Sequence, residues 1–357
     1  MKFSKLLVAV LVSTFLFVSC TDDSDKIEAP LGNYDNGLLI LNQGGFGKGN
    51  ASVSYLSDDF VTQQNNIFSL VNPTLILGDT GQDIGLYQNL AFIVLNVSNK
   101  IEVVNRYTMA HIATVSSGLN NPRYIAFSNG KAFVTNWGDG GSATDDYVAV
   151  LNLSTYAVSS AIPVAEGPER IVESNSKLYV AHQGGYGFGK TISVLNGSTN
   201  AILSTINVGD VPNSLEINNG ILYVLCGGKP SYSGAETAGS LVKVNLTNGT
   251  VSSTINFPAK THPSNLDVVA SDFYYTIKSD IFKSSLNAAT LPTTALFSTT
   301  AQGVSGVYSF AVNNTKIYVG DAGDYSSNGK IYVYSSTGSL EKDYTVGVIP
   351  AGFYFNE

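Results

Sequence analysis

The sequence predicts an all-β protein that folds as one seven-bladed β-propeller. Three observations predict this fold class. Short apolar segments of one type recur along the 357 residues, about 46 residues apart, which is close to the period of four-stranded propeller blades. Polar turns follow these segments in a constant order. Outside the first residues, no apolar period of 3.6 residues persists, so long helices are not expected. A β-sandwich accommodates so many like-ordered units poorly.

Each predicted blade holds a strand of the Leu-Tyr-Val type and then a strand that ends in an Asn or Ser turn. The alternation and the β-branched and aromatic residues are typical of sheet. The first strands lie at residues 38–42, 91–95, 132–135, 178–181, 222–225, 273–277 and 317–320. The second strands lie at residues 53–56, 101–105, 148–152, 192–196, 242–245, 281–285 and 331–335.

Third strands lead into Gly/Pro turns, at residues 121–123, 167–170, 211–213 and 262–264. Fourth strands follow and end in tight hairpins at residues 128–130 and 218–220, where Asn-Gly pairs supply left-handed backbone. The tail at residues 348–355 repeats the turn and fourth-strand pattern, yet no further strand follows it. The chain also opens at Leu38 with a strand that lacks a predecessor. We therefore expect strands from the two termini to share one blade, which removes free sheet edges.

The first residues resemble a bacterial lipoprotein signal. Lys2 and Lys5 precede an apolar core that ends in Ser19-Cys20, and acidic residues follow. We predict a signal peptide at residues 1–19, a lipidated Cys20 with a flexible tether at residues 20–37, and the propeller at residues 38–357. The acidic residues after Cys20 resemble the export tag by which Bacteroidetes place lipoproteins on the outer face of the outer membrane, and this resemblance implies a lipid-anchored protein exposed at the cell surface. The alternative is ordinary secretion with an incidental cysteine.

Composition narrows the function. The formal net charge is −8, and no basic cluster offsets it, so nucleic acid and anionic lipid surfaces are not expected partners. The membrane is contacted only through the lipid anchor. Cys226 is the one cysteine after Cys20, so the mature domain holds no intrachain disulfide and depends on core burial for stability.

The loops after the Leu-Tyr-Val strands and the Pro turns fall on one face of the ring, because strands alternate in direction. These loops combine aromatic and amide side chains, which suits a large amphipathic ligand. Alternatively, the loops only pack on one another. The predicted ligand-binding residues are Asn42, Phe46, Asn50, Asn96, Asn99, Arg123, Trp137, Arg170, His182, Gln183, Tyr186, Phe188, Tyr232 and Tyr325.

Arg123 and Arg170 follow Pro turns in adjacent units and offer bidentate donors for a phosphate or carboxylate. The alternative pairs Arg170 with Glu169 or Glu166. No metal, cofactor or catalytic residue is predicted. The three histidines lack ligand spacing, and the glycine-rich segment at residues 184–190 leads into a strand instead of a helix. Asp139, Asp145 and Asp146 are expected to be solvated acids, with a Ca²⁺ site as the alternative.

The repeat resembles the YncE-like, surface-layer type of seven-bladed propeller. The opening at residues 38–52, the segment 77–84 and the turn at 121–125 resemble the DUF5074-type lipoprotein propellers of Bacteroidetes. That group includes the cobalamin-capture lipoproteins. The resemblance implies a non-enzymatic cap that captures a corrinoid (vitamin B12) as transported ligand for a TonB-dependent outer-membrane transporter. The alternatives are a general protein- or glycan-binding scaffold and a lactonase- or lyase-type propeller enzyme.

Overall fold

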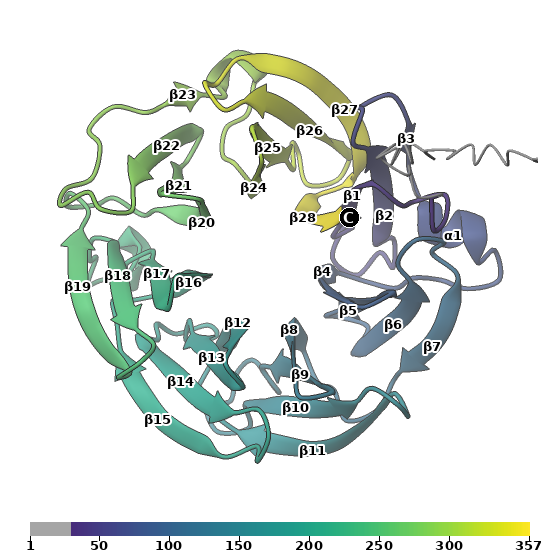
Figure 1. The fold of residues 1–357 in the computed structure, drawn as a ribbon, viewed down its shortest axis with the longest axis horizontal. Helices are drawn as coiled ribbons and strands as arrows, with labels where there is room; N and C mark the ends of the chain where they lie inside the picture. The colour runs from purple at the N-terminus through teal and green to yellow at the C-terminus, as the bar shows by residue number, and fades with distance from the viewer. Residues whose placement is uncertain (1–29) are drawn as a thin grey trace, which may run out of the picture. The chain divides into compact units, whose positions relative to one another are not determined.

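The computed structural model describes residues 30–357 and shows seven four-stranded antiparallel sheets arranged around a central axis (Figure 1). The prediction of a seven-bladed β-propeller is confirmed. The predicted signal peptide, Cys20 and the first part of the predicted tether lie outside the described residues.

Each blade has one strand at the axis and three strands that follow it outward. The axial strands are β4 (Gly81–Tyr87), β8 (Pro122–Ser128), β12 (Pro168–Ser174), β16 (Pro212–Asn218), β20 (Ser264–Val269), β24 (Ser309–Asn313) and β28 (Pro350–Asn356). The second strands are β1 (Gly37–Asn42), β5 (Leu90–Leu95), β9 (Lys131–Asn136), β13 (Lys177–His182), β17 (Ile221–Cys226), β21 (Asp272–Ile277) and β25 (Lys316–Asp321).

The outer half of each blade holds the two remaining strands. The third strands are β2 (Ser52–Ser57), β6 (Lys100–Asn105), β10 (Tyr147–Asn152), β14 (Thr191–Asn196), β18 (Ser240–Asn245), β22 (Asp280–Ser285) and β26 (Asn328–Ser335). The outermost strands are β3 (Gln63–Gln64), β7 (His111–Val115), β11 (Ala157–Pro163), β15 (Ile202–Asn207), β19 (Thr250–Asn256), β23 (Phe297–Ser298) and β27 (Leu340–Val348).

Burial explains why the second and third strands are the most apolar. Neighbouring blades cover both faces of these strands, so β13 and β14 are buried at four or more consecutive positions. The outermost strand of the same blade, β15, is exposed at five of its six residues and carries Ser and Thr. The predicted hairpin at residues 128–130 is also present, because Asn129 and Gly130 both adopt positive φ, 50° and 70°.

The two ends of the chain share one blade, as predicted. β28 pairs antiparallel with β1, with Leu38 opposite Phe355 and Ile40 opposite Phe353. Phe353 is buried in the same cluster as Leu38 and Ile40. The ring is therefore closed by hydrogen bonds between its first and last strands (Figure 1).

Two details differ from the sequence-based expectation. Residues 31–36 fall in the predicted tether, yet Tyr34 is buried, with its ring 5.4 Å from the ring of Tyr55. Ordered packing thus begins before Leu38, because this tyrosine finds an apolar partner. A short helix, α1 (Ile67–Val71), follows β3 and buries Ile67 and Phe68. None of the helices in the described part of the chain is long and apolar enough to cross a membrane.

Candidate ligand-binding face

The loops that follow the second strands are tied to the starts of the axial strands. In five blades, the residue directly before the axial strand has positive φ. Its carbonyl accepts a hydrogen bond from the backbone N–H of a residue at the start of the loop that follows the second strand. The pairs are Gln43 to Ile349, Asn96 to Thr80, Trp137 to Asn121, Gln183 to Gly167 and Gly227 to Val211, at 2.7–3.2 Å. Because both partners lie at the same end of each blade, the loops share one face, and we call it the loop face.

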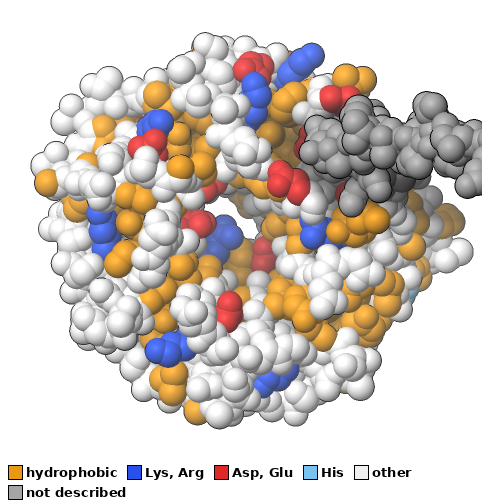
Figure 2. Space-filling view, in the orientation of Figure 1, with side chains coloured by type: hydrophobic (Ala, Val, Ile, Leu, Met, Phe, Trp, Pro, Cys, Tyr) orange, Lys and Arg blue, Asp and Glu red, His pale blue; other side chains and the backbone are white. Residues whose placement is uncertain are grey.

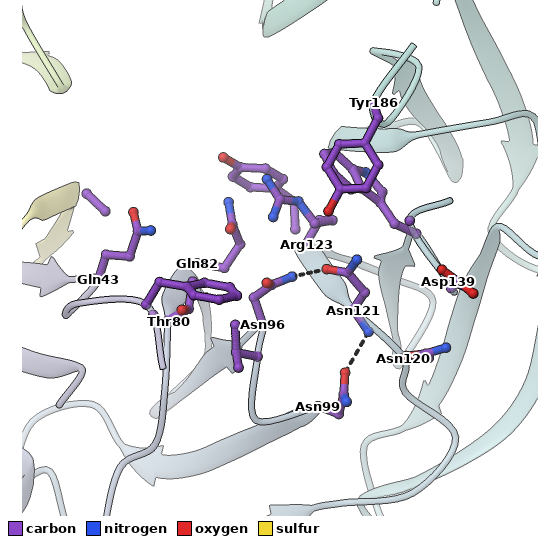
Figure 3. A pocket seen from close by; sticks show the side chains of 18 of the residues that line it. Gln43, Thr80, Gln82, Asn96, Asn99, Asn120, Asn121, Arg123, Asp139 and Tyr186 are labelled. Carbon is purple, nitrogen blue, oxygen red and sulfur yellow. Dashed lines mark hydrogen bonds between the residues drawn. The ribbon is translucent and has the colours of Figure 1, made fainter. Parts of the chain in front are cut away.

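A cavity of about 640 Å³ opens on the loop face (Figure 3). Two kinds of side chain dominate its lining, and we call it the amide cavity. The side-chain amides belong to Gln43, Gln82, Asn96, Asn99, Asn120 and Asn121. The aromatic residues are Phe46, Tyr124, Trp137, Tyr186 and Tyr308.

Some of the amides position one another. Asn96 donates from Nδ2 to the side-chain oxygen of Asn121 and, at 3.0 Å, to the carbonyl of Pro122 (Figure 3). The backbone N–H of Asn121 donates to Oδ1 of Asn99 at 2.6 Å. Within residues 30–357, the side-chain nitrogens of Asn99, Asn121 and Gln82 donate to no protein atom. The side-chain oxygens of Asn99 and Asn121 are held by hydrogen bonds, so the nitrogens of these two residues are oriented donors that a ligand can use.

The aromatic side of the amide cavity contains both fixed and exposed rings. Trp137 donates from Nε1 to the carbonyl of Pro168 at 3.1 Å and is 9% exposed. Tyr186 lies edge-on to it, with ring centroids 6.1 Å apart, and is 80% exposed. Phe46 is also 80% exposed. Exposed aromatic rings beside fixed amides form a surface suited to stacking and hydrogen bonding together.

The two predicted arginine donors have different partners. Arg123 forms a bidentate ion pair with Glu169, at 2.9 Å from Nε and 2.8 Å from a terminal nitrogen, and its guanidinium lies 4.3 Å from the Trp137 ring centroid. Within residues 30–357, Arg170 forms no ion pair with Glu169 or Glu166, so the alternative pairing is not found. Instead, the Arg170 guanidinium stacks 4.1 Å from the ring centroid of Tyr124.

A second cavity, of about 350 Å³, continues along the axis between the axial strands, and we call it the channel cavity. Arg170, Tyr124 and Tyr308 line both cavities. Glu216 and Asp267 line the channel cavity alone. Figure 2 shows basic and acidic side chains around the central opening. Burial raises the pKa of Glu216 to about 8, with the nearby Asp267 adding to the rise and Arg170 opposing it, so Glu216 is largely protonated at neutral pH.

A third cavity, of about 520 Å³, lies beside the amide cavity on the loop face, and we call it the side groove. Gln183, Phe188 and Tyr232 line it, and Tyr186 borders both this groove and the amide cavity. The Phe188 and Tyr232 rings are 6.3 Å apart, and Tyr232 is 85% exposed. The side groove thus contains fewer side-chain amides than the amide cavity, only Gln183 and Asn213.

The predicted residues divide into those that line a cavity and those that do not. The amide cavity is lined by Phe46, Asn96, Asn99, Arg123, Trp137, Arg170 and Tyr186. The side groove is lined by Gln183, Tyr186, Phe188 and Tyr232. Neither cavity is lined by Asn42, Asn50, His182 or Tyr325.

Asn42 and His182 are corrections to the predicted set, because both are buried. Asn42 is fully buried, and its Nδ2 donates to Ser54 Oγ at 2.9 Å. His182 is 1% exposed, and its Nε2 lies 2.8 Å from Ser193 Oγ. Burial lowers the pKa of His182 to about 4, so its ring is neutral at physiological pH. Neither side chain is available at the loop face.

Asn50 and Tyr325 lie at the surface, and their side chains contact neighbouring loop residues. Asn50 accepts the backbone N–H of Gly45 at 2.9 Å and so shapes its own loop. Tyr325 is 59% exposed and packs edge-on against Tyr308, with ring centroids 5.8 Å apart.

Several lining residues were missed by sequence reasoning, which considered the long loops and the arginines. Gln82, Tyr124 and Tyr308 sit at or just before the beginnings of axial strands and face the cavities. Their repeated position, directly before or after the Pro or Gly turn of successive units, is the signal that identifies them. Asn120 and Asn121 precede β8 and could be found in the same way, whereas Gln43 lies in the loop after β1.

The acidic loop does not form a metal cluster in the described residues. Asp145 accepts the backbone N–H of Asp139 at 2.8 Å, which lowers the pKa of Asp145. Asp146 is 3% exposed and accepts the backbone N–H of Gly167 at 2.8 Å. Burial raises the pKa of Asp146 to about 6. These acids hold the loop that carries Trp137 in place.

Ring, loop face and cavities together define a β-propeller with a recessed polar and aromatic surface at one end of its axis. Residues 36–355 match the family model described as a domain of unknown function, DUF5074. The chain belongs to that family. No curated protein matches it.

Solved structures share the fold at low sequence identity. One is a quinoprotein alcohol dehydrogenase-like protein from Bacteroides thetaiotaomicron, with a TM-score of 0.61, 12% identity and coverage of 91% of this chain and 79% of that chain. Another is BamB from Moraxella catarrhalis, with a TM-score of 0.52, 16% identity and coverage of 89% and 85%. The computationally designed protein Ika8 has a TM-score of 0.58, 11% identity and 92% coverage of both chains. These likenesses concern the fold alone.

Proposed function

We propose that the protein is a non-enzymatic capture protein that binds a large amphipathic ligand in the amide cavity. One observation carries the proposal: side-chain amides without protein acceptors and exposed aromatic rings line a single cavity of about 640 Å³. Amide donors and acceptors match a ligand that carries many amide or hydroxyl groups, and the rings match a flat apolar surface. Arg123 adds no free positive charge, because Glu169 neutralises it.

A corrinoid is the candidate ligand. It combines a flat macrocycle with peripheral amide groups, and these are the two chemistries that the amide cavity offers. The sequence resemblance to cobalamin-capture lipoproteins supports the same choice. In this proposal Cys20 anchors the protein in the outer membrane, the loop face is exposed at the cell surface, and a TonB-dependent transporter receives the ligand.

Capture without chemistry is supported by the structural role of two acids on the axial strands, Asp83 and Asp267. Asp83 accepts the backbone N–H of Ile125 at 3.0 Å, and Asp267 accepts that of Val312 at 2.7 Å. Both carboxylates thus link an axial strand to the next blade. Acids that hold the ring together are poorly suited to act as the general acid or base of a lactonase or lyase.

The direct test is titration of the purified domain with cyanocobalamin, followed by quenching of intrinsic fluorescence. We expect saturable binding at micromolar ligand or tighter. Phe46→Ala should weaken it about tenfold or more, because Phe46 is exposed and its loss removes stacking area without disturbing the core. Tyr232→Ala is the matched control: its ring is equally exposed but lines only the side groove, so affinity should stay unchanged.

The outcomes separate the function classes. No quenching by micromolar cyanocobalamin would reject the corrinoid. Equal losses in the two variants would reject the amide cavity as the site. A domain that does not bind cyanocobalamin but binds glycans on an array, or a partner protein, would favour the scaffold alternative.

A further inference from the structure

Arg170 differs from the other arginines of this chain in how its guanidinium is used. The arginines are Arg106, Arg123 and Arg170. Arg106 donates to the Asn356 side chain and, at 2.9 Å, to the carbonyl of Glu357. Arg123 is held by both oxygens of Glu169. Within residues 30–357, the Arg170 guanidinium donates to no protein atom, and no carboxylate oxygen lies within 4.0 Å of it.

The position of Arg170 makes these donors accessible to a solute. The side chain lies where the amide cavity meets the channel cavity, and it lines both. Stacking on Tyr124, at 4.1 Å, fixes the plane of the guanidinium without occupying its N–H groups. A guanidinium is a planar fork of donors that matches the two oxygens of a phosphate or carboxylate.

The acids around Arg170 leave its donors unoccupied. Asp83 is one of the nearby groups that favour the charged form of Arg170, but its two oxygens accept from Ile125 N and from the Tyr354 hydroxyl, each at 3.0 Å. The carboxyl group of Glu216 also lines the channel cavity, and burial raises its pKa to about 8. At neutral pH this group is mostly uncharged, so it does not repel an anion and can donate a hydrogen bond to one.

We infer that Arg170 forms an oxyanion subsite at the mouth of the channel cavity, which takes a phosphate group of a ligand whose body fills the amide cavity. The placement of the ligand body rests on the proposed function. The oxyanion subsite itself does not, because it follows from the free guanidinium and its stacked, fixed orientation.

The first experiment tests the subsite without any corrinoid. The folded domain is treated with phenylglyoxal, which modifies arginine, and the sites are quantified by mass spectrometry with and without millimolar inorganic phosphate. We expect modification at Arg170 and slowing of about threefold or more by phosphate, but not by sodium chloride of equal ionic strength. Arg106 is the internal control, because it lines neither cavity and its guanidinium is held by Asn356 and Glu357.

Two outcomes would overturn the inference. An Arg170 that stays unmodified in the free domain would show that its guanidinium is closed to solutes. Equal protection by phosphate and chloride would show only general ionic screening.

The second experiment connects the subsite to the ligand. Cyanocobalamin contains a phosphodiester, whereas dicyanocobinamide lacks it. Arg170→Gln should lower the affinity for cyanocobalamin about tenfold and change the affinity for dicyanocobinamide less than about twofold. This difference is expected for the loss of one charge-assisted contact. Equal losses for both ligands would contradict a phosphate-specific role. If neither corrinoid binds the unaltered domain, the proposed function fails, and the phosphate protection of Arg170 still decides the subsite.

Discussion

Individual ionisable side chains around the axis make the free energy of unfolding depend on pH. Glu216 is the main case, because burial raises its pKa from 4.5 to about 8. Between these two values the unfolded chain releases this proton while the folded protein keeps it. The contribution of Glu216 to the free energy of unfolding is therefore zero below about pH 4.5 and becomes increasingly unfavourable as the pH rises to about 8.

Glu216→Gln should remove this dependence, since a glutamine is neutral at every pH and has a similar shape. We expect the variant and the unaltered protein to have similar stability near pH 4.5. Near pH 8 the variant should be more stable by on the order of 3 kcal/mol. Urea denaturation at both pH values measures the difference. Glu341→Gln, at an exposed surface ion pair with Lys316, is the control and should show no such gain. A Glu216 variant that gains nothing at pH 8 would mean that folding does not raise the pKa of this carboxyl group.

Residue identity alone did not separate binding side chains from structural ones. Asn42, at the end of β1, and Asn99, in the loop after β5, lie at the same end of their blades, yet Asn42 is enclosed by Ser52 and Ser54. The partner of Arg123, Glu169, lies 46 residues away in the next blade. Such pairing depends on how blades stack, and no local pattern in the sequence encodes it.

At the level of elements, β28 determines whether the ring is closed. It pairs along β1, and Asn356 at its end donates to the carbonyls of Tyr34 and Arg106. β28 therefore fixes the first blade and the segment that precedes it. Without β28, β1 would expose an unpaired edge and the cluster around Phe353 would open.

Deletion of residues 350–357 should therefore destabilise the domain strongly. Loss of a buried aromatic side chain such as Phe353 alone costs about 3 kcal/mol or more, and the deletion adds the lost strand pairing. Thermal unfolding monitored by circular dichroism is the measurement. Removal of Glu357 alone is the control and should leave the transition nearly unchanged. A full deletion that unfolds at the temperature of the intact domain would contradict closure by β28.

The strands and their order were predictable because they depend on local signals. Apolar alternation sets each strand, and turns such as Asn129-Gly130 set each hairpin. The short helix at Ile67–Val71 was not predicted, since five residues carry too little periodic pattern. The cavities were predictable only as a shared face, because their walls combine residues from several blades.

At the scale of the whole molecule, the seven blades enclose the one cysteine of the described chain. Cys226 ends β17, is fully buried, and burial raises the pKa of its thiol to about 12. A buried, protonated thiol reacts slowly, because the thiolate is the reactive form. Labelling of Cys226 therefore reports opening of the ring around it.

A mature domain that lacks Cys20 should show almost no reaction with Ellman's reagent while folded. In urea, the labelling of Cys226 should rise with the same midpoint as the loss of β-structure, if the ring unfolds cooperatively. Ser253→Cys, at an exposed position on β19, is the control and should react at once. Rapid labelling of Cys226 in the folded domain would show that the blade around β17 opens separately.

The pairing of β28 with β1 also determines when the ring can close during synthesis. The first strand to leave the ribosome lacks its axial neighbour until the final residues emerge. At ordinary translation rates this delay lasts tens of seconds or so, during which the nascent chain cannot complete its ring. An incomplete chain therefore stays open, and only a full-length product acquires the closed ring on which the loop face depends.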